Sequence, residues 1–165
     1  MKLTLKDIVL FALFGGMMFV SKLLLEFLPN IHLIAMFITA FTVVYRWKGI
    51  FPISVFVFLT GLVGGFQPWW FPYLYIWTIL WAVVLSLPKN MPKGIATVVY
   101  CAVCGLHGLC FGLLYAPAQA VLFGLDLKGT IAWIIAGLPF DFIHAVGNVL
   151  AGLLVVPIVT VLKKV

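Results

Sequence analysis

Long apolar runs alternate with short polar breaks along the whole chain. A helix needs about 20 residues to cross about 30 Å of hydrocarbon, because each residue rises about 1.5 Å. The runs are continuous and lack the period-two alternation of membrane β-strands. This pattern predicts an all-α integral membrane fold with short loops. The six expected membrane-spanning helices are Ile8–Leu28, Ile31–Tyr45, Ile50–Phe66, Tyr73–Leu87, Gly94–Leu114 and Ile131–Val161.

Composition sets the class of protein. Of the 165 residues, 65% are hydrophobic and 8% are charged, whereas soluble domains carry about 25% charged residues. These proportions exclude a water-soluble fold and a nucleic-acid-binding module. Because the spans use most of the chain, we expect one transmembrane domain over residues 1–165, surrounded by the lipid bilayer.

The distribution of charge predicts the orientation. The net charge is +6, from 10 Lys and Arg against 4 Asp and Glu. Alternating spans put Lys22 and Lys128 toward one side and the other cations on the opposite side. Since cytoplasmic loops carry the excess of Lys and Arg, both termini of this multi-pass membrane protein are expected in the cytoplasm. The cations assigned to the cytoplasmic side are Lys2, Lys6, Arg46, Lys48, Lys89, Lys93, Lys163 and Lys164.

A polar stripe lies within the last predicted span. At 100° per residue, Asp141, His144 and Asn148 fall within a sector of about 60°, and Trp133 extends the same stripe. A charged group at mid-membrane costs at least about 2.5 kcal/mol, so Asp141 needs a functional or structural reason. Two interpretations remain open: a ligand-binding site, or a hydrogen-bonded set that ties helices together.

A stripe of aromatic residues runs along the fourth predicted span. Tyr73, Trp77 and Trp81 are spaced by four residues and therefore share one helix face. Such rings suit a flat heterocyclic ligand. They also serve as anchors at membrane interfaces, so pocket and anchor remain alternatives for this stripe.

Several residues in the predicted outer loops are candidates to cover a cavity that opens outside. They are polar or aromatic and lie at the ends of spans on the side with few cations. We expect them to act as a gate for such a cavity. These residues are Asn30, His32, Trp69, Trp70 and Gln119.

Three cysteines and a histidine are spaced by three residues in the fifth predicted span. Cys101, Cys104, His107 and Cys110 are residue types that bind metals. However, steps of 300° spread them over about 180° of helix surface, so one ion cannot collect all four. We therefore expect no metal site, packing roles for the cysteines, and a His107 side chain that points into the interior.

A patch of small residues lies on the first predicted span. Ala12 and Gly16 are four residues apart, and Gly15 is adjacent. Small residues at this spacing allow close approach of two helices. The patch is therefore a candidate for docking of a partner protein, with packing inside the chain as the alternative.

These features together resemble a known family of membrane proteins. The strings Pro139-Phe140-Asp141-Phe142-Ile143-His144 with Asn148, and Leu28-Pro29-Asn30-Ile31-His32, are similar to motifs of substrate-binding S components of energy-coupling-factor (ECF) transporters. The resemblance implies a six-helix subunit that captures a vitamin or related micronutrient outside. It also implies ligand-facing roles for Asp141, His144 and Asn148, and docking through Ala12 and Gly16, where the family usually has two alanines.

The resemblance also implies partners. They are a transmembrane coupling protein and two ATP-binding-cassette ATPases, which would hydrolyse ATP. This chain contains no G-x-x-x-x-G-K-[ST] phosphate loop, so we do not expect it to hydrolyse ATP itself. No cofactor is expected in this chain. The leading hypothesis is a non-enzymatic capture subunit for a small aromatic heterocycle, with Trp77 or Trp81 stacking on it. The alternatives are a membrane enzyme that uses Asp141 and His144 as acid and base, and a structural scaffold subunit.

Overall fold

The fold consists of helices joined by short connections. The computed structural model describes residues 3–164, and no β-strand occurs within them. The all-α prediction is therefore confirmed. Two short 3₁₀ helices, η1 (Arg46–Gly49) and η2 (Pro68–Trp70), lie in connections. The α-helices are α1 (Leu5–Leu24), α2 (Ile34–Tyr45), α3 (Ile50–Gly64), α4 (Tyr73–Ser86), α5 (Lys93–Leu109), α6 (Phe111–Phe123), α7 (Leu127–Gly152) and α8 (Val155–Leu162).

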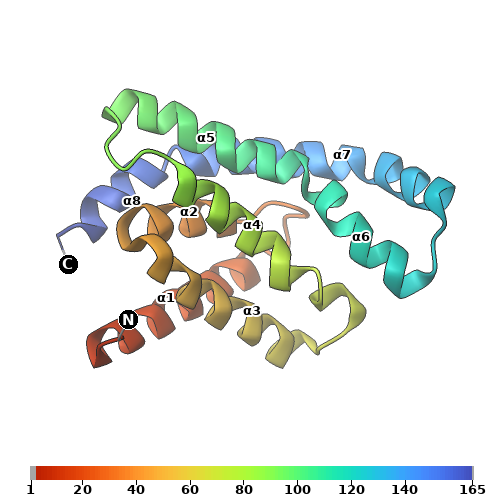
Figure 1. The fold of residues 1–165 in the computed structure, drawn as a ribbon, viewed down its shortest axis with the longest axis horizontal. Helices are drawn as coiled ribbons and strands as arrows, with labels where there is room; N and C mark the ends of the chain where they lie inside the picture. The colour runs from red at the N-terminus through yellow and green to blue at the C-terminus, as the bar shows by residue number, and fades with distance from the viewer. Residues whose placement is uncertain (1–2, 165) are drawn as a thin grey trace.

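Five helical stretches of the described chain are long and apolar enough to cross a membrane. One of them, Ile34–Gly64, contains a reversal, because Arg46 has φ 54° and ψ −128° and ends α2. As a result α2 and α3 run in opposite directions (Figure 1). Another stretch, Lys93–Phe123, is interrupted at Cys110. The structure thus supports a multi-pass membrane protein, and the number of spans and their orientation stay predictions.

Several predicted spans have different boundaries in the structure. The first, expected over Ile8–Leu28, is α1 and ends at Leu24. The fifth, expected to reach Leu114 or beyond, ends at Leu109, and a second helix, α6, continues to Phe123. The last span begins at Leu127, four residues before the predicted Ile131, because the Asp126 carboxylate accepts a hydrogen bond from the Gly129 amide at 2.7 Å and caps α7. It ends at Gly152, and α8 follows as a separate helix.

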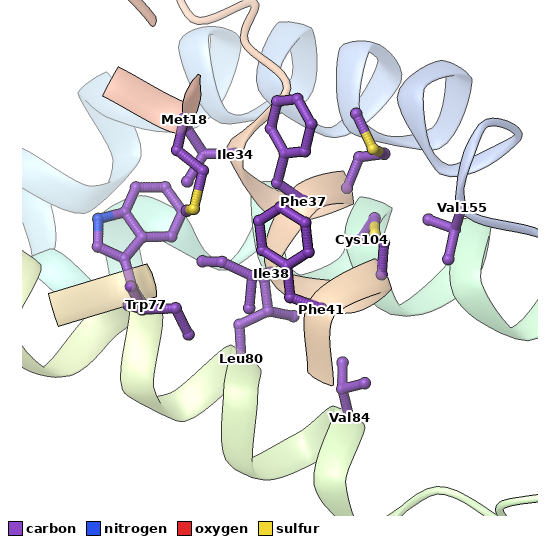
Figure 2. Packing of buried hydrophobic residues seen from close by; sticks show 14 of the residues in the cluster. Met18, Ile34, Phe37, Ile38, Phe41, Trp77, Leu80, Val84, Cys104 and Val155 are labelled. Atoms are coloured by element: carbon purple, nitrogen blue, oxygen red, sulfur yellow. The ribbon is translucent and has the colours of Figure 1, made fainter. Parts of the chain in front are cut away.

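The helix α2 forms the centre of the molecule. All nine residues from Ile34 to Thr42 are buried, as expected for a helix that is hydrophobic on every face and surrounded by other helices. Its side chains pack against residues of α4, α5 and α8 (Figure 2). The Trp77 indole lies at the edge of this core, with its nitrogen directed away from Ile38 and Phe41 (Figure 2).

Cationic segments gather at one end of the bundle. The start of α1, η1, the connection between α4 and α5, and the end of α8 lie at this end (Figure 1). The Arg46 guanidinium donates a hydrogen bond to the Leu85 carbonyl, and Lys48 forms an ion pair with Asp7 at 2.9 Å. Lys2 lies outside the described residues. The grouping agrees with the sequence pattern, and the membrane side it faces stays a prediction.

Candidate functional site

A cluster of aromatic rings surrounds Trp77, which is only 1% exposed. Ring centroids of four other residues lie between 5.5 and 5.7 Å from the Trp77 ring. We call these five residues, with His144, the aromatic cluster. The neighbours of Trp77 are His32, Tyr73, His107 and Phe111.

Five separate segments supply this cluster. The α4 helix contributes Tyr73 and Trp77, α5 contributes His107, the start of α6 contributes Phe111, α7 contributes His144, and the connection between α1 and α2 contributes His32. The His144 ring lies edge-on to two of them, at 4.6 Å from His32 and 4.9 Å from Phe111. Residues far apart in the sequence therefore converge on one point between the helices.

Buried polar atoms without a partner are concentrated at this point. Within residues 3–164, six buried side-chain nitrogen or oxygen atoms form no hydrogen bond. Four of them are His32 Nδ1, His107 Nδ1, His144 Nε2 and Trp77 Nε1, all in the aromatic cluster. An unsatisfied buried polar atom costs about 1–3 kcal/mol, and native proteins contain few of them. The concentration of such atoms therefore makes this point the candidate ligand site of the described chain.

The cluster borders a small cavity with polar walls. This cavity, of about 200 Å³, is lined by His32, Tyr73, Phe111 and His144, together with Lys22 and Glu26 of the α1 end and residues of the following connection. We call it the histidine cavity. An apolar groove of about 610 Å³ lies beside it and shares Leu25, Ile31 and His32 as a wall. Small-molecule sites typically measure about 300–1,000 Å³, so the histidine cavity as it stands holds only part of a ligand.

Asp141 is buried, but it faces a neighbouring helix rather than the histidine cavity. Both of its carboxylate oxygens accept the backbone N–H of Gly112, each at 3.1 Å. Gly112 lies in the first turn of α6, where unpaired N–H groups favour a negative charge. A Cβ atom at Gly112 would lie 2.4 Å from Asp141 Oδ2, so the approach requires glycine. This contact holds α6 against α7 and fixes the helix turn that carries His144.

Asn148 and His107 join the helices behind the cavity. The Asn148 amide nitrogen donates to the Cys104 carbonyl at 3.2 Å, and its Oδ1 is another of the unpartnered atoms. The His107 Nε2 lies 3.2 Å from the Ile76 carbonyl. Gly108 permits this packing, because a Cβ there would lie 2.9 Å from the Asn148 amide nitrogen. Asn148 is buried as expected for the polar stripe, His107 is buried as expected for a side chain that points into the interior, and each keeps one unpartnered polar atom.

Several predicted site residues lie away from the histidine cavity. Trp133 stacks on Tyr115 at 5.8 Å, and Trp81 packs against the central core with its indole nitrogen unpartnered. The Trp70 indole donates to the Val57 carbonyl at 2.8 Å. None of the three lines the cavity.

Some of the predicted gate residues line the histidine cavity and others lie away from it. Asn30, with φ 59°, and His32 line the histidine cavity from the connection between α1 and α2. The Trp69 ring contacts Tyr73 at 5.7 Å, so it touches the edge of the aromatic cluster. Gln119 was expected in a loop, but it lies inside α6 because that helix continues to Phe123.

The small residues of α1 face two directions. Gly15 packs inside the chain: a Cβ there would lie 2.5 Å from Val55 Cβ and 2.8 Å from the Pro52 carbonyl oxygen. Ala12 is exposed, and a Cβ at Gly16 would meet no atom within 4 Å. Intramolecular packing therefore accounts for Gly15, whereas Ala12 and Gly16 present an open surface.

The cysteines are free thiols in the described chain. Cys104 is buried, with its sulfur 3.3 Å from the Thr39 hydroxyl. Among residues 3–164 no three His, Cys, Asp or Glu side chains gather as a potential metal site. Of the four residues in the cysteine and histidine series, Cys104 contacts α2 through Thr39, and His107 contacts α4 through the Ile76 carbonyl.

Three residues of the site were not assigned to it from the sequence. Phe111 contacts both Trp77 and His144, and Lys22 and Glu26 line the cavity as its charged groups. The one signal for Lys22 and Glu26 is their spacing of four residues near the end of a span, which puts both charges on one face. Phe111 carries no signal, since it is one aromatic residue in an apolar run.

Comparison with known proteins gives no assignment. No family model, no curated protein and no solved structure matches this chain.

Proposed function

We propose that this chain is the substrate-capture subunit, or S component, of an ECF-type importer in a prokaryotic cell membrane. Its ligand is a small aromatic heterocycle of the vitamin or micronutrient class, which it binds from outside. The observation that carries this proposal is the group of unpartnered polar atoms within the aromatic cluster. Rings provide stacking surfaces, and convergent polar atoms provide orientation, which is the usual composition of a small-molecule site.

The available atoms define the chemistry of the ligand. His32 and His144 line the histidine cavity, and their free nitrogens donate or accept according to tautomer. The Trp77 N–H, the His107 nitrogen and the Asn148 carbonyl do not line it as it stands, so in this proposal they reach the ligand only when the site opens. A planar molecule with both donors and acceptors on its edge satisfies this set. Lys22 and Glu26 lie at the wall of the cavity and are placed to meet a polar substituent of the ligand.

Binding of a whole ligand requires the connection between α1 and α2 to move. At about 200 Å³ the histidine cavity is smaller than a typical site. His32 and Ile31 separate it from the groove of about 610 Å³, so displacement of this connection would join the two spaces. We infer that Asn30 and His32 open and close the site, as a gate.

Partner proteins supply the energy in this proposal. The chain has no phosphate loop, so a coupling protein and two ATPases would hydrolyse ATP. The exposed Ala12 and the open surroundings of Gly16 support docking of the coupling protein on this face of α1.

The geometry favours this role over acid–base catalysis. Acid–base catalysis by Asp141 and His144 requires both side chains to reach the same bound substrate. His144 lines the histidine cavity, but Asp141 does not, and its carboxylate oxygens accept the Gly112 N–H instead.

Chemical analysis of the purified protein tests the proposal. The chain is purified in mild detergent from cells grown on rich medium, then denatured, and the released small molecules are identified by mass spectrometry. We expect one ultraviolet-absorbing compound of a few hundred daltons per chain. Trp77→Phe, which removes the unpartnered N–H donor of the aromatic cluster, is expected to carry about 10-fold less of it, whereas Trp133→Phe, outside the aromatic cluster, serves as the matched control. Release of no compound from either protein, with turnover of added lipids, would instead favour an enzyme.

A further inference from the structure

A second cavity lies at the cationic end of the bundle. It measures about 400 Å³ and is lined by residues of the connection between α4 and α5, the start of α5, and α8. These segments lie at the same end of the bundle (Figure 1). Lys89, Lys93 and Lys163 come from these three segments and line it together. Within residues 3–164 none of the three lysines forms an ion pair. We call it the basic cavity.

Two further groups suited to an anion accompany the lysines. The helix α5 starts at Lys93 without a side-chain cap, so the N–H groups of its first turn are unpaired and carry partial positive charge. Tyr100 is 5% exposed and lines the cavity, and its hydroxyl forms no hydrogen bond to any described residue. Lysine ammonium groups, a helix N-terminus and a hydroxyl are the usual ligands of a phosphate group.

Apolar residues line the basic cavity together with the lysines. They are Val43, Met91, Ala96, Val156 and Val159, and the neighbouring surface of α8 exposes Val161. A free inorganic anion makes no favourable contact with apolar side chains. A phospholipid makes both kinds of contact, because its phosphate and glycerol lie at the membrane surface while its acyl chains continue along the apolar helices.

From these contacts we propose that the basic cavity binds the phosphate headgroup of an anionic phospholipid. The phosphate lies between the Lys93 and Lys163 ammonium groups near the α5 N-terminus, and Tyr100 donates a hydrogen bond to it. The acyl chains extend over Val156 and Val159. Lipid at this position would hold α8 against α5 and is independent of the proposed substrate.

Native mass spectrometry with added lipids tests this proposal. The protein is delipidated in detergent and titrated with phosphatidylglycerol, with phosphatidylcholine, and separately with inorganic phosphate alone. Lys93→Gln/Lys163→Gln is compared with Lys6→Gln/Lys164→Gln, which removes the same charge from the same end of the bundle but from residues outside the cavity. Since each cation near an anionic lipid contributes a factor of about 5, the first pair is expected to weaken phosphatidylglycerol binding about 30-fold and the control pair about 2-fold or less.

Two outcomes would overturn the proposal. Equal losses in the two double variants would show that general attraction to the cationic end explains the binding. Binding of inorganic phosphate with no preference for phosphatidylglycerol over phosphatidylcholine would show an anion site without lipid recognition. Tyr100→Phe provides a second check in a fold-preserving variant, with an expected loss of about 5-fold for phosphatidylglycerol alone.

Discussion

Substitution of Asp141 tests which contact fixes the start of α6 after the interruption at Cys110. Its carboxylate is buried and accepts the Gly112 N–H with both oxygens at 3.1 Å. A hydrogen bond to a charged group contributes about 1.5–3 kcal/mol, and a charge at a helix N-terminus adds about 0.3–2 kcal/mol. Asp141→Ala is therefore expected to lower the free energy of unfolding by about 2–4 kcal/mol, and Asp141→Asn, which keeps one acceptor oxygen, by about half as much.

A second substitution makes the test specific to this contact. A Cβ atom at Gly112 would lie 2.4 Å from Asp141 Oδ2, so Gly112→Ala displaces the carboxylate and is also destabilising. In the double variant the alanine at position 141 no longer clashes. The combined loss is then expected to be smaller than the sum by about 1 kcal/mol or more, because residues in contact are not additive.

Unfolding followed by tryptophan fluorescence in detergent measures these losses. The Gly16→Ala variant is the control, since a Cβ there meets no atom within 4 Å. Strictly additive losses for the two substitutions, or an Asp141→Ala protein as stable as the wild type, would refute the reasoning. The same Asp141→Asn protein should retain ligand affinity within about 10-fold, because Asp141 positions the turn that carries His144 and does not line the cavity.

Three further predictions concern α1 and the cationic end. Gly15→Leu should destabilise the fold by about 2 kcal/mol or more in thermal unfolding, because Gly15 approaches α3 closely. Gly16→Leu should leave the stability unchanged and reduce co-purification of the ATPases, because Gly16 faces an open surface. Arg46→Ala should cost about 1–3 kcal/mol in the same assay, because it removes a charge-assisted hydrogen bond to the last turn of α4; an unchanged unfolding temperature would contradict this role. A double-mutant cycle on Asp7 and Lys48 should give only a weak coupling at low salt and a weaker one at high salt, because the pair is partly exposed.

The sequence predicts the end of α2 and the start of α4 correctly, because charged residues or prolines mark both boundaries. Tyr45 ends α2 as expected from the charged residues that follow it, and Tyr73 begins α4 after two prolines, as expected. Charges and prolines interrupt an apolar run for local reasons, so they are visible in the sequence. The break at Cys110 is not visible, because its neighbours are apolar or small and the tertiary contact between Asp141 and Gly112 holds the start of α6 in place.

The candidate site shows the same division between local and tertiary information. Helical periodicity correctly grouped Asp141, His144 and Asn148 on a buried face of α7. It does not indicate which neighbour each side chain meets, so a carboxylate expected at the ligand meets a backbone N–H instead. Trp133 belongs to the same stripe, but it lies nearer the start of α7, beside Tyr115, and does not line the cavity.

Occupancy of the aromatic cluster in the intact protein is the most direct test of the proposed function. Native mass spectrometry of the protein as purified counts the bound small molecule on each chain. We compare the wild type with His144→Phe, which keeps a ring at that position and removes the unpartnered Nε2, and with Trp133→Phe as the control. The account predicts one adduct of a few hundred daltons per chain in the wild type and the control, and about 10-fold weaker retention in His144→Phe. Equal occupancy in all three proteins would contradict it.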